Sequence, residues 1–588
     1  MTSPSRAARE AARGRVRRGR LLLGAVALAA PSTPALATTA SAEEQPARAP
    51  VVSEVIVTAR PNPEDPPVVA EARTRLAETP GAVSVVPQEA FENRFAVGLA
   101  DMLRGVPGVV ASKRYGEESR FSIRGSGVGN ANHLRGVLLA QDGVPFNQAD
   151  GFGDFQEIDP LTVRYAEVYK GGNALRFGGA ALGGAVNFVT PTGRTADFEQ
   201  RLRLEGGSFG TVRGHAAAAG ARGAWDGYAA VTAASARGFR DQSDGTAARL
   251  SLNLGRRLGE EGEVRLILQA GDVQQEIPGP LTLAQAERTP RLVNPANIAG
   301  DFARDLRTAR MTLQTRWGLG QGWTAEGAIY GAWKELYHPI SIVVDQESVN
   351  SGGFGRLDWT GEVGGRRADL FTGAYLRASD LEALVFTNRQ ASRGVRTGDS
   401  LQRSRALDLF AEGRLFVTER LALVAGGSYG RAERDFRDDV NRARSRERTY
   451  DWFAPRVGLL WEDEGGEQAY ANVTRSVEPP NFGALVQPTV PGFVPLDAQD
   501  AWTAEVGTRG RRGPWVWDAA LFRSEIEGEL LNFVVGPDIP AATFNAGPTI
   551  RQGLEAALDW RGPALGGEVL VRQAYAWSDF RFDGDRRY

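Results

Sequence analysis

From about Phe198 to the end of the chain, apolar residues alternate with polar or small ones in segments of ten or so residues. In the segment 247–254, positions 248, 250, 252 and 254 are apolar, while positions 249, 251 and 253 are polar. A period of two is typical of a β-strand whose faces meet different surroundings. The alternation fits a soluble sandwich with its apolar face inward and also a membrane barrel with its apolar face outward, so it predicts strands without deciding between these folds.

The spacing of two tryptophans bears on that choice. Trp323 and Trp333 are ten residues apart in the segment "WTAEGAIYGAW" and fall on the same face of the expected strand. At ~3.3 Å per residue, about 33 Å separates them along the strand. A tilt of about 40° reduces this to about 25 Å, the height of the lipid-facing band between the aromatic girdles of an outer-membrane barrel. The spacing therefore favours the membrane barrel.

The lengths of the connections favour a barrel as well. Short breaks between expected strands occur near Gly220 and from Gly318, Glu362, Glu462 and Arg511. They alternate with long connections expected at about 271–304, 335–351, 379–402, 432–452, 478–500 and 531–546. Short turns on one side of the membrane and long loops on the other are typical of an up-and-down transmembrane barrel.

The same pattern predicts about 17 barrel strands by Tyr588. An odd number would make the first and last strands parallel, whereas bacterial single-chain barrels have even numbers of antiparallel strands. Either this count is wrong or the barrel is incomplete at its C-terminal end, and we expect the latter. A longer relative would continue by roughly five strands, on the order of 100 residues, to an even number near 22.

The first residues of the chain resemble an export signal. Seven arginines between positions 6 and 20 precede the apolar run 21–30, and small-residue cleavage sites end at Ala37 and Ala42. This arrangement predicts a cleaved signal peptide, residues 1–42. A membrane anchor is the alternative, but the apolar run is too short to cross a bilayer of ~30 Å as a helix. We therefore expect an exported protein.

Composition excludes several functional classes. The 588 residues carry a net charge of −2, which leaves no basic footprint for nucleic acid. There is no cysteine, hence no disulfide, thiolate nucleophile or cysteine-ligated metal. The three histidines, His133, His215 and His338, are far apart and lack metal-binding spacing. We therefore expect neither an enzyme nor a resident metal or other cofactor.

Residues 70–195 differ from the strands that follow, residues 196–588. They combine short strands, glycine turns and one helix-like piece at 98–109, and predict a compact α/β domain. Seven motifs occur in a fixed order, namely "SEVIVTAR" from Ser53, "ETPGAVSVVPQE" from Glu78, "LADMLRGVPGVV" from Leu99, "FSIRGSG" from Phe121, "VLLAQDGVPFN" from Val137, "AEVYKGGNALRFGGAALGGAVNFVTPTG" from Ala166 and "ANVTRSVEPPNFGAL" from Ala471. In this order they resemble the TonB-dependent outer-membrane receptors.

The resemblance implies a large antiparallel transmembrane β-barrel, of 22 strands in the family, with residues 70–195 as an α/β plug in its lumen. Residues 43–69 would be a periplasmic extension that carries the box bound by TonB. The box consists of Ser53, Glu54, Val55, Ile56, Val57, Thr58, Ala59 and Arg60. In the family the box pairs edge-to-edge with the C-terminal domain of TonB, which belongs to an energising complex of the inner membrane.

The resemblance also implies a set of charges between plug and barrel. In the family, two plug arginines face two barrel glutamates, and the first arginine corresponds to Arg124 in "IRG". At the second place this chain has Lys170, a point charge instead of a bidentate fork. The glutamates correspond to Glu505 and Glu555, and strand parity turns both to the lumen because their apolar neighbours would face lipid. The alternative is that water solvates these charges.

The plug resembles the branch of the family that takes up ferric siderophores and ferric citrate. Its outward apices would offer ligand contacts from Arg114, Tyr115, Asn130, Asn147, Gln148 and Asp150. Arginine suits an anionic ferric complex, although ordinary surface polarity would look the same. The iron would be held by its chelator, so no protein metal ligands are expected.

Other functions remain open at this point. Cobalamin, heme, nickel, copper and saccharide receptors share the architecture, and a passive porin or adhesin and a barrel enzyme are further classes. The resemblance implies TonB-dependent transport of a scarce ligand by a monomer in the bacterial outer membrane. Its partners would be TonB, a small-molecule chelate, and the lipid and lipopolysaccharide around the barrel.

Overall fold

The computed structural model describes residues 65–127, 134–178, 181–487, 492–533, 542–564 and 566–584. These residues belong to one compact unit, residues 58–588. The expected signal peptide, the box from Ser53 to Arg60 and the candidate ligand residue Asn130 lie outside the described residues.

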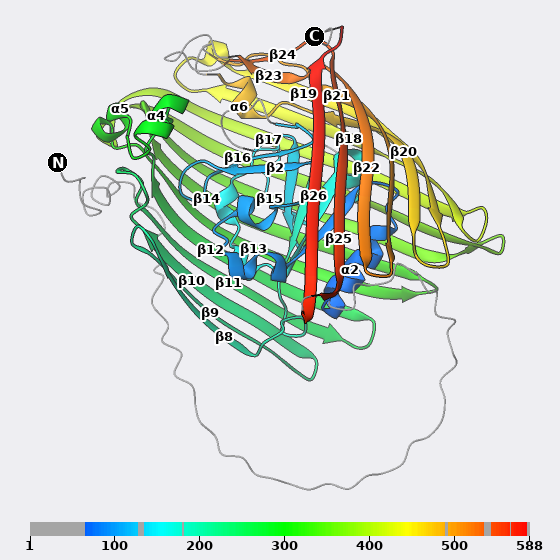
Figure 1. Ribbon diagram of the computed structural model, residues 1–588. Coiled ribbons are helices and arrows are strands. Elements are labelled where there is room, and N and C mark those ends of the chain that lie inside the picture. The colour runs from blue at the N-terminus through cyan, green and yellow to red at the C-terminus, as the bar shows by residue number, and fades with distance from the viewer. Residues whose placement is uncertain are drawn as a thin grey trace. The chain divides into compact units, whose positions relative to one another are not determined.

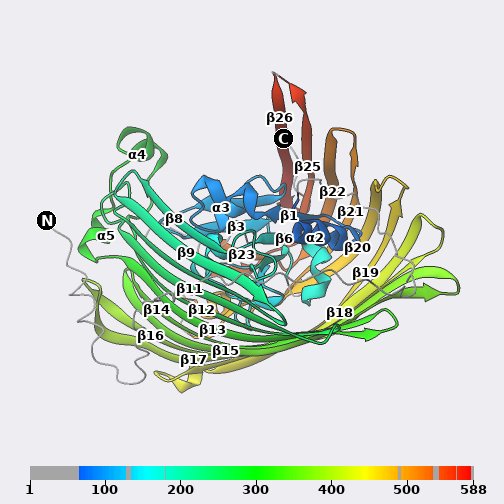
Figure 2. The ribbon, with the colours of Figure 1, turned by 90° about the horizontal axis from the view of Figure 1, so that it is seen from below.

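In the described part of the chain, seventeen strands form one antiparallel sheet that curls around a smaller N-terminal domain (Figures 1 and 2). The strands are β8 (Gln200–Gly207), β9 (Thr211–Arg222), β10 (Trp225–Ala236), β11 (Gly245–Leu258), β12 (Gly262–Glu276), β13 (Ala303–Gly320), β14 (Trp323–Pro339), β15 (Ile342–Val363), β16 (Arg366–Arg389), β17 (Ser392–Phe416), β18 (Leu421–Asp438), β19 (Arg446–Glu462), β20 (Gln468–Glu478), β21 (Gln499–Arg512), β22 (Trp515–Glu527), β25 (Thr549–Ala564) and β26 (Gly567–Phe582). The expected strand number and up-and-down order are confirmed.

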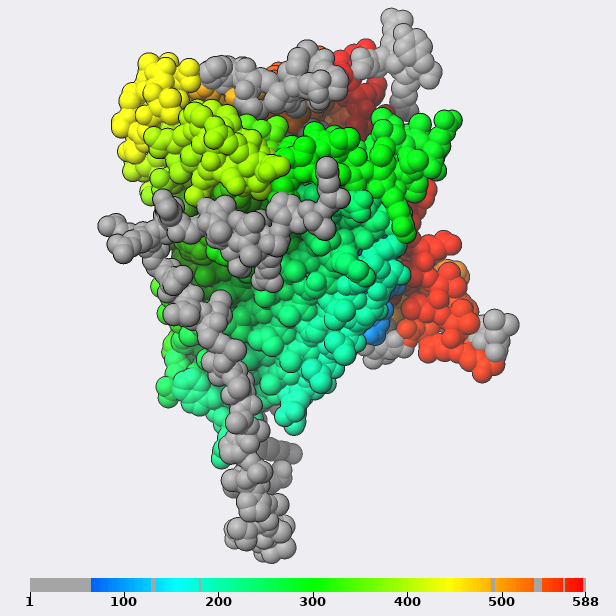
Figure 3. All heavy atoms as spheres, turned by 90° about the vertical axis from the view of Figure 1, so that its left-hand side faces the viewer, coloured from blue at the N-terminus to red at the C-terminus, as the bar shows by residue number. Residues whose placement is uncertain are grey.

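The alternating pattern separates an apolar outer face from a polar inner one. On β19, Phe453, Val457 and Trp461 point outward and are 58%, 56% and 40% exposed, while Arg456, of the opposite parity, is buried. On β14, exposed Ile329 has the same parity as Trp323 and Trp333, so the two tryptophans lie on the outer face as expected. Figure 3 shows the outer surface of the barrel strands that come first in the chain. Apolar side chains exposed in this way fit a lipid-facing band.

The predictions of long connections at 335–351 and 379–402 are wrong. Residues 340–341 alone join β14 to β15, and residues 390–391 alone join β16 to β17, because these strands continue as paired hairpins. Beyond the lipid band both faces of a strand meet water, so its residues lose the alternation and resemble a loop in the sequence. The connection between β12 and β13 is long as expected and contains α4 (Leu283–Arg288) and α5 (Pro295–Ala299).

Three further connections lie on the same side of the barrel as α4 and α5. Strands β18 and β19 are joined by residues 439–445, which is shorter than expected. The connection from β20 to β21 contains α6 (Phe482–Leu485), and that from β22 to β25 contains the hairpin of β23 (Leu530–Phe533) and β24 (Ala542–Asn545). This side therefore holds the larger connections, and the opposite side holds the short turns.

The domain inside the barrel is the expected α/β plug. A five-stranded sheet has the order β1-β6-β7-β4-β5, and a separate hairpin consists of β2 and β3. The strands are β1 (Val83–Pro87), β2 (Val109–Lys113), β3 (Ser119–Ile123), β4 (Val137–Gln141), β5 (Val144–Pro145), β6 (Tyr165–Lys170) and β7 (Gly184–Val189). Its core includes Leu99, Ile123, Leu139 and Val168, all fully buried.

The helices of the plug differ from the expectation. The helix-like piece at 98–109 gives only the single turn α3 (Leu99–Met102), while the main helix, α2 (Pro67–Ala77), begins within residues 43–69, which we assigned to the periplasmic extension. Its prolines resemble breakers in the sequence, but proline is well suited to the first turn of a helix, where its missing N–H has no partner to lose. The expected boundary between residues 69 and 70 falls inside this helix. No helix in the described ranges is both long and apolar enough to span a membrane.

The outer face gives a testable prediction. Val457→Arg places a charge between Phe453 and Trp461, at mid-height of the apolar band, and we expect it to destabilise the folded barrel by ~2–4 kcal/mol. Thr449→Arg is the control, because Thr449 lies on the same face of the same strand beyond Phe453. Urea titration in lipid vesicles measures both, and equal stabilities would contradict the lipid-facing assignment.

Candidate functional site

A buried ion-pair cluster joins the plug to the barrel wall. The Arg124 guanidinium donates from Nε to Glu555 Oε1 at 2.9 Å and from Nη2 to Glu555 Oε2 at 3.0 Å. Its Nη1 lies 2.5 Å from Oε2 of Glu505. Lys170 Nζ donates to Glu555 Oε2 at 3.2 Å. The structure thus brings together the four charged residues that the resemblance singled out.

The local backbone brings Arg124 into this position. Arg124 directly follows β3 and has a φ of 51°, a left-handed conformation that non-glycine residues rarely adopt. Its N–H donates to the Gly108 carbonyl at 2.9 Å. A Cβ on Gly108, which has a φ of 77°, would lie only 1.9 Å from Glu555 Oε1, so glycine is needed for the glutamate to reach the arginine. The cost of this backbone conformation is offset by the two carboxylates.

The two glutamates of the cluster have different further partners. Lys170 contacts Glu555, whereas Glu505 accepts from Asn173 Nδ2 at 3.3 Å and from the Ala82 N–H at 2.6 Å. Burial by itself would lower the pKa of Arg124, but the two glutamates raise it above its ordinary value. The guanidinium therefore remains charged, and its field is balanced by the paired carboxylates.

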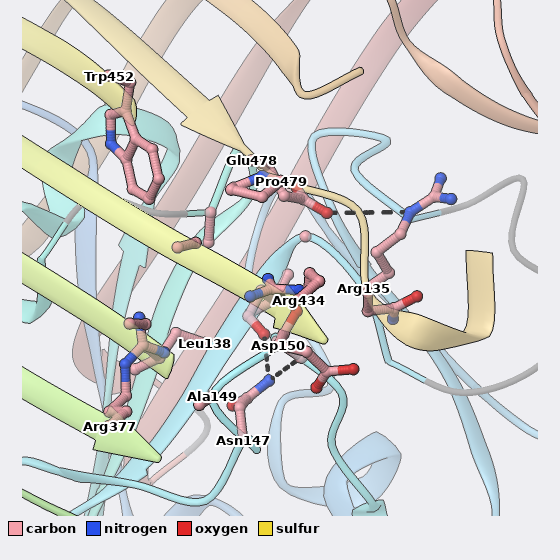
Figure 4. Close-up of a pocket in the computed structure, with 17 residues that line it drawn as sticks. Arg135, Leu138, Asn147, Ala149, Asp150, Arg377, Arg434, Trp452, Glu478 and Pro479 are labelled. Atoms are coloured by element: carbon pink, nitrogen blue, oxygen red, sulfur yellow. Dashed lines mark hydrogen bonds and ion pairs between the residues drawn. The ribbon is translucent and has the colours of Figure 1, made fainter. Parts of the chain in front are cut away.

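A pocket lies between the plug and the barrel on the side of the larger connections (Figure 4). The plug contributes Arg135 and the loop that contains Asn147 and Asp150, and the wall contributes lumen-facing side chains. Those of the wall include Arg377 on β16, Arg434 on β18, Trp452 on β19 and Glu478 at the end of β20. Three arginines from separate elements thus line one pocket.

Several donors on residues that line this pocket make no hydrogen bond within the described residues. Arg135 Nε, Arg377 Nε and Trp452 Nε1 are buried without a hydrogen bond. Arg377 Nη2 donates to Asp408 at 2.7 Å, and Arg135 Nε lies 3.9 Å from Glu478. Buried donors without partners are costly, and an anionic ligand with several oxygens would satisfy them.

Arg434 plays a different part. Its guanidinium donates to the carbonyl oxygens of Pro480, Glu433 and Asp150 at 3.1, 3.1 and 3.2 Å. These bonds tie the plug loop at Asp150 to the connection that follows β20. Arg434 therefore supports the wall of the pocket instead of offering free donors.

The candidate ligand residues of the plug fall into two groups. Asn147, Gln148 and Asp150 are buried, and their side chains are used in internal contacts. Asn147 Oδ1 accepts from the Leu139 N–H at 2.7 Å, Gln148 donates to Ser348 at 3.5 Å, and Asp150 Oδ2 accepts from the Phe482 N–H at 2.9 Å.

The other two described candidates, Arg114 and Tyr115, lie in the turn between β2 and β3. Arg114 is exposed and Tyr115 half-buried, and the guanidinium lies 5.9 Å from the tyrosine ring centre. Burial raises the pKa of Tyr115 to about 12, so its hydroxyl stays protonated. Neither residue lines the pocket with the three arginines.

Sequence reasoning missed the arginines of the pocket. Strand parity indicates that Arg377 and Arg434 face the lumen, but it does not indicate which lumen charges meet. Glu478 stands in the motif "ANVTRSVEPPNFGAL", which was the available signal for this region. Among the described residues, no group of three histidine, cysteine or acidic side chains is placed to hold a metal ion.

Comparison with known proteins agrees with this architecture. The family model described as TonB dependent receptor-like, beta-barrel matches residues 194–588, and the model described as TonB-dependent Receptor Plug Domain matches residues 75–185. The chain belongs to the TonB-dependent receptor family. The plug model covers Arg124 and Lys170, and the barrel model covers Glu505 and Glu555, so the cluster joins the two family domains.

Two receptors resemble the chain in sequence over short stretches. The vitamin B12 transporter BtuB of Vibrio vulnificus is 30% identical over 122 residues, which are 21% of this chain and 20% of that protein. The ferric enterobactin receptor PirA of Pseudomonas aeruginosa is 32% identical over 149 residues, 22% of this chain and 19% of the receptor. The chain thus matches about a fifth of the length of these relatives.

Solved structures match over most of the chain. The unliganded ferric citrate transporter FecA superposes with a TM-score of 0.72 at 18% identity, covering 88% of this chain and 80% of its own. The pyoverdine receptor FpvA of Pseudomonas aeruginosa gives 0.70 at 17% identity, with 87% and 79% covered. The copper transporter OprC gives 0.69 at 14% identity, with 84% and 80% covered. At these identities the likeness shows the fold alone.

The cluster gives a second prediction. Glu555→Gln leaves Arg124 and Lys170 without their shared carboxylate, and we expect a loss of ~3–5 kcal/mol in stability because both cations stay buried. Asp559→Asn is the control, since Asp559 lies on the same strand and pairs with the exposed Arg572 at 3.1 Å. Its expected loss is about 0–1 kcal/mol. Thermal unfolding in detergent compares the two, and similar losses would contradict the role of the cluster.

Proposed function

We propose that the protein actively transports a ferric siderophore or a ferric citrate-type chelate across the bacterial outer membrane, with energy supplied through TonB. The observation that carries the proposal is a plug held in the barrel lumen by buried ion pairs, with an arginine-lined pocket on one side of it. A barrel without a plug is a passive pore. A filled barrel needs work before a solute can pass, and the outer membrane has no nucleotide supply of its own.

The charge of the pocket supports an anionic ligand. Arg135 and Arg377 both line the pocket, and the Nε of each makes no hydrogen bond within the described residues. Guanidinium groups bind carboxylate and other planar oxygen acceptors in bidentate fashion, and ferric citrate-type chelates carry such groups. The iron in such a complex is held by its chelator, so the protein needs no metal ligand of its own.

A non-iron ligand is the second candidate. Its support is the sequence match with the vitamin B12 transporter of Vibrio vulnificus, which is of the same quality as the match with the enterobactin receptor. Direct binding of ferric citrate, ferric hydroxamates, ferric catecholates and cobalamin to the purified protein separates the two. Saturable binding of cobalamin alone would overturn the iron assignment. The family consists of transporters and receptors, which leaves little reason to propose an enzyme.

The proposed partners follow from the same reasoning. The box, residues 53–60, would pair with the C-terminal domain of TonB, and the outer face of the barrel would contact lipid and lipopolysaccharide. We propose an outer-membrane location after cleavage of the signal peptide, and a monomeric state. The plug–barrel ion pairs lie within one chain, which is consistent with a monomer.

Deletion of the box tests the proposed energy source. Removal of residues 53–60 is expected to abolish uptake of the radiolabelled chelate while its affinity for the protein stays unchanged, because the pocket is formed by other residues. The control removes residues 44–51, an equally long piece of the same extension. Unchanged uptake after deletion of the box would refute TonB-dependent transport.

Substitution in the pocket tests the ligand site. Arg377→Gln removes a buried donor, and we expect chelate affinity to fall about 10- to 100-fold, the loss of one charged hydrogen bond of ~1.5–3 kcal/mol. Arg405→Gln is the control, because Arg405 lies on the adjacent strand but points outward and pairs with Asp380 at 2.8 Å. Equilibrium binding measurements give the chelate affinity of both variants, and equal affinities would exclude Arg377 from the site.

A further inference from the structure

A short segment of the plug is attached to the barrel wall on the side of the short turns. This anchor segment, residues 78–82 with the sequence "ETPGA", joins α2 to β1. Arg509 on β21 holds three carbonyl oxygens at this place, those of Ala77 and Thr79 at 2.7 Å each and that of Gly81 at 3.1 Å. One barrel arginine thus binds the backbone at alternate positions.

Three more strands contribute to the attachment. Arg456 on β19 and Asn472 on β20 both donate to the Pro80 carbonyl, at 3.2 and 2.5 Å. Arg414 on β17 donates to the Glu78 carbonyl at 3.0 Å. The segment is outside any sheet, so its carbonyl groups need donors from elsewhere, and the lumen side chains supply them. The attachment depends on backbone position and therefore breaks when the segment moves.

Close packing buries residues 80–82 of the anchor segment. A Cβ on Gly81 would lie 1.9 Å from Asn173 Oδ1, and a Cβ on Gly458 of β19 would lie 3.3 Å from Pro80 Cγ. Glycine at position 81 therefore lets the segment lie directly against Asn173. Buried hydrogen bonds, such as those to the Pro80 carbonyl, are stronger than exposed ones.

The anchor segment is also coupled to the ion-pair cluster. Glu505 Oε1 accepts from the Ala82 N–H at 2.6 Å, while its Oε2 lies 2.5 Å from Arg124 Nη1. Asn173 reinforces the link, since it donates to Glu505 at 3.3 Å and accepts from Arg456 at 3.2 Å. Detachment of Ala82 therefore removes one hydrogen bond from the same carboxylate that holds Arg124.

The order of these contacts along the chain matters for a pull from the N-terminal side. The box precedes α2 in the chain. In the described part of the plug, Ala77 is the first residue that forms a hydrogen bond with the barrel. Arg73 and Arg75 of α2 form ion pairs with Asp65 and with Glu167 on β6 of the plug, so neither of these pairs involves the barrel. Tension applied at the box reaches the anchor segment before it reaches Arg124.

We infer that the anchor segment is the force-bearing attachment of the plug, which must detach from the barrel wall during transport, and that Glu505 passes the detachment on to Arg124. This inference rests on the proposed function, because only coupling to TonB puts tension on the box. It assigns Arg509, Arg456 and Asn472 as positioning residues that set the force needed to open the plug.

A reversible disulfide tests the detachment. The chain has no cysteine, so Pro80→Cys with Gly458→Cys creates a single pair at a place where a Cβ on residue 458 would lie 3.3 Å from Pro80 Cγ. With the disulfide closed, we expect uptake to fall at least tenfold at unchanged chelate affinity, and reductant to restore it. Each single-cysteine variant under the same oxidant is expected to keep full uptake. Full uptake with the disulfide closed would overturn the inference, whereas no uptake by the parent protein would overturn the proposed function.

A force measurement tests the attachment without relying on transport. The purified full chain in lipid vesicles is pulled from a cysteine introduced by Ser53→Cys, with and without Arg509→Ala. We expect Arg509→Ala to lower the force of the first rupture, because three carbonyl bonds are lost. Arg512→Ala is the matched control, since Arg512 is exposed on the same strand and pairs with Glu467 at 2.7 Å. Equal first-rupture forces in all three proteins would overturn the inference whether or not a chelate is transported.

Discussion

The structure depends on the buried charges that Arg124 and Lys170 of the plug share with Glu505 and Glu555 of the barrel. Ions removed from water are stable only when each has a partner in good geometry, so this cluster constrains its surroundings. It requires a left-handed Arg124, a glycine at position 108, and glutamates at lumen-facing positions of two different strands. A plug in another orientation would leave the charges unpaired.

The same constraint gives the inner face of the barrel two functions. Lumen arginines on the side of the short turns bind the plug backbone, as Arg509 and Arg456 do at the anchor segment. On the side of the larger connections, Arg377 and Arg135 keep Nε donors that make no hydrogen bond to a described residue. Guanidinium suits both tasks because it offers several N–H groups in a rigid fork. One kind of side chain thus holds the plug at one end and provides ligand chemistry at the other.

Much of the fold could be predicted from local patterns. The outward parity of Trp323 and Trp333, the lumen parity of Glu505 and Glu555 and the seventeen strands all follow from a period of two, which each strand carries in its own residues. Prediction failed where this signal was missing or misleading. The hairpins of β14–β15 and β16–β17 extend past the lipid-facing band, where the regular alternation is lost, and the prolines at α2 begin a helix that they seemed to prevent.

By itself, the sequence determined the alternation of apolar and polar residues along each strand and the order of the plug motifs. It also determined whether each barrel charge faces the lumen or the outside, because these are properties of neighbouring residues. Only the tertiary structure decided which charges meet. Glu505 lies 423 positions after Ala82 and 381 after Arg124 in the chain, yet its two carboxylate oxygens hold both. The pocket of Arg135, Arg377 and Arg434 was likewise decided by the curvature of the sheet and the seating of the plug, since no local pattern records how distant strands converge.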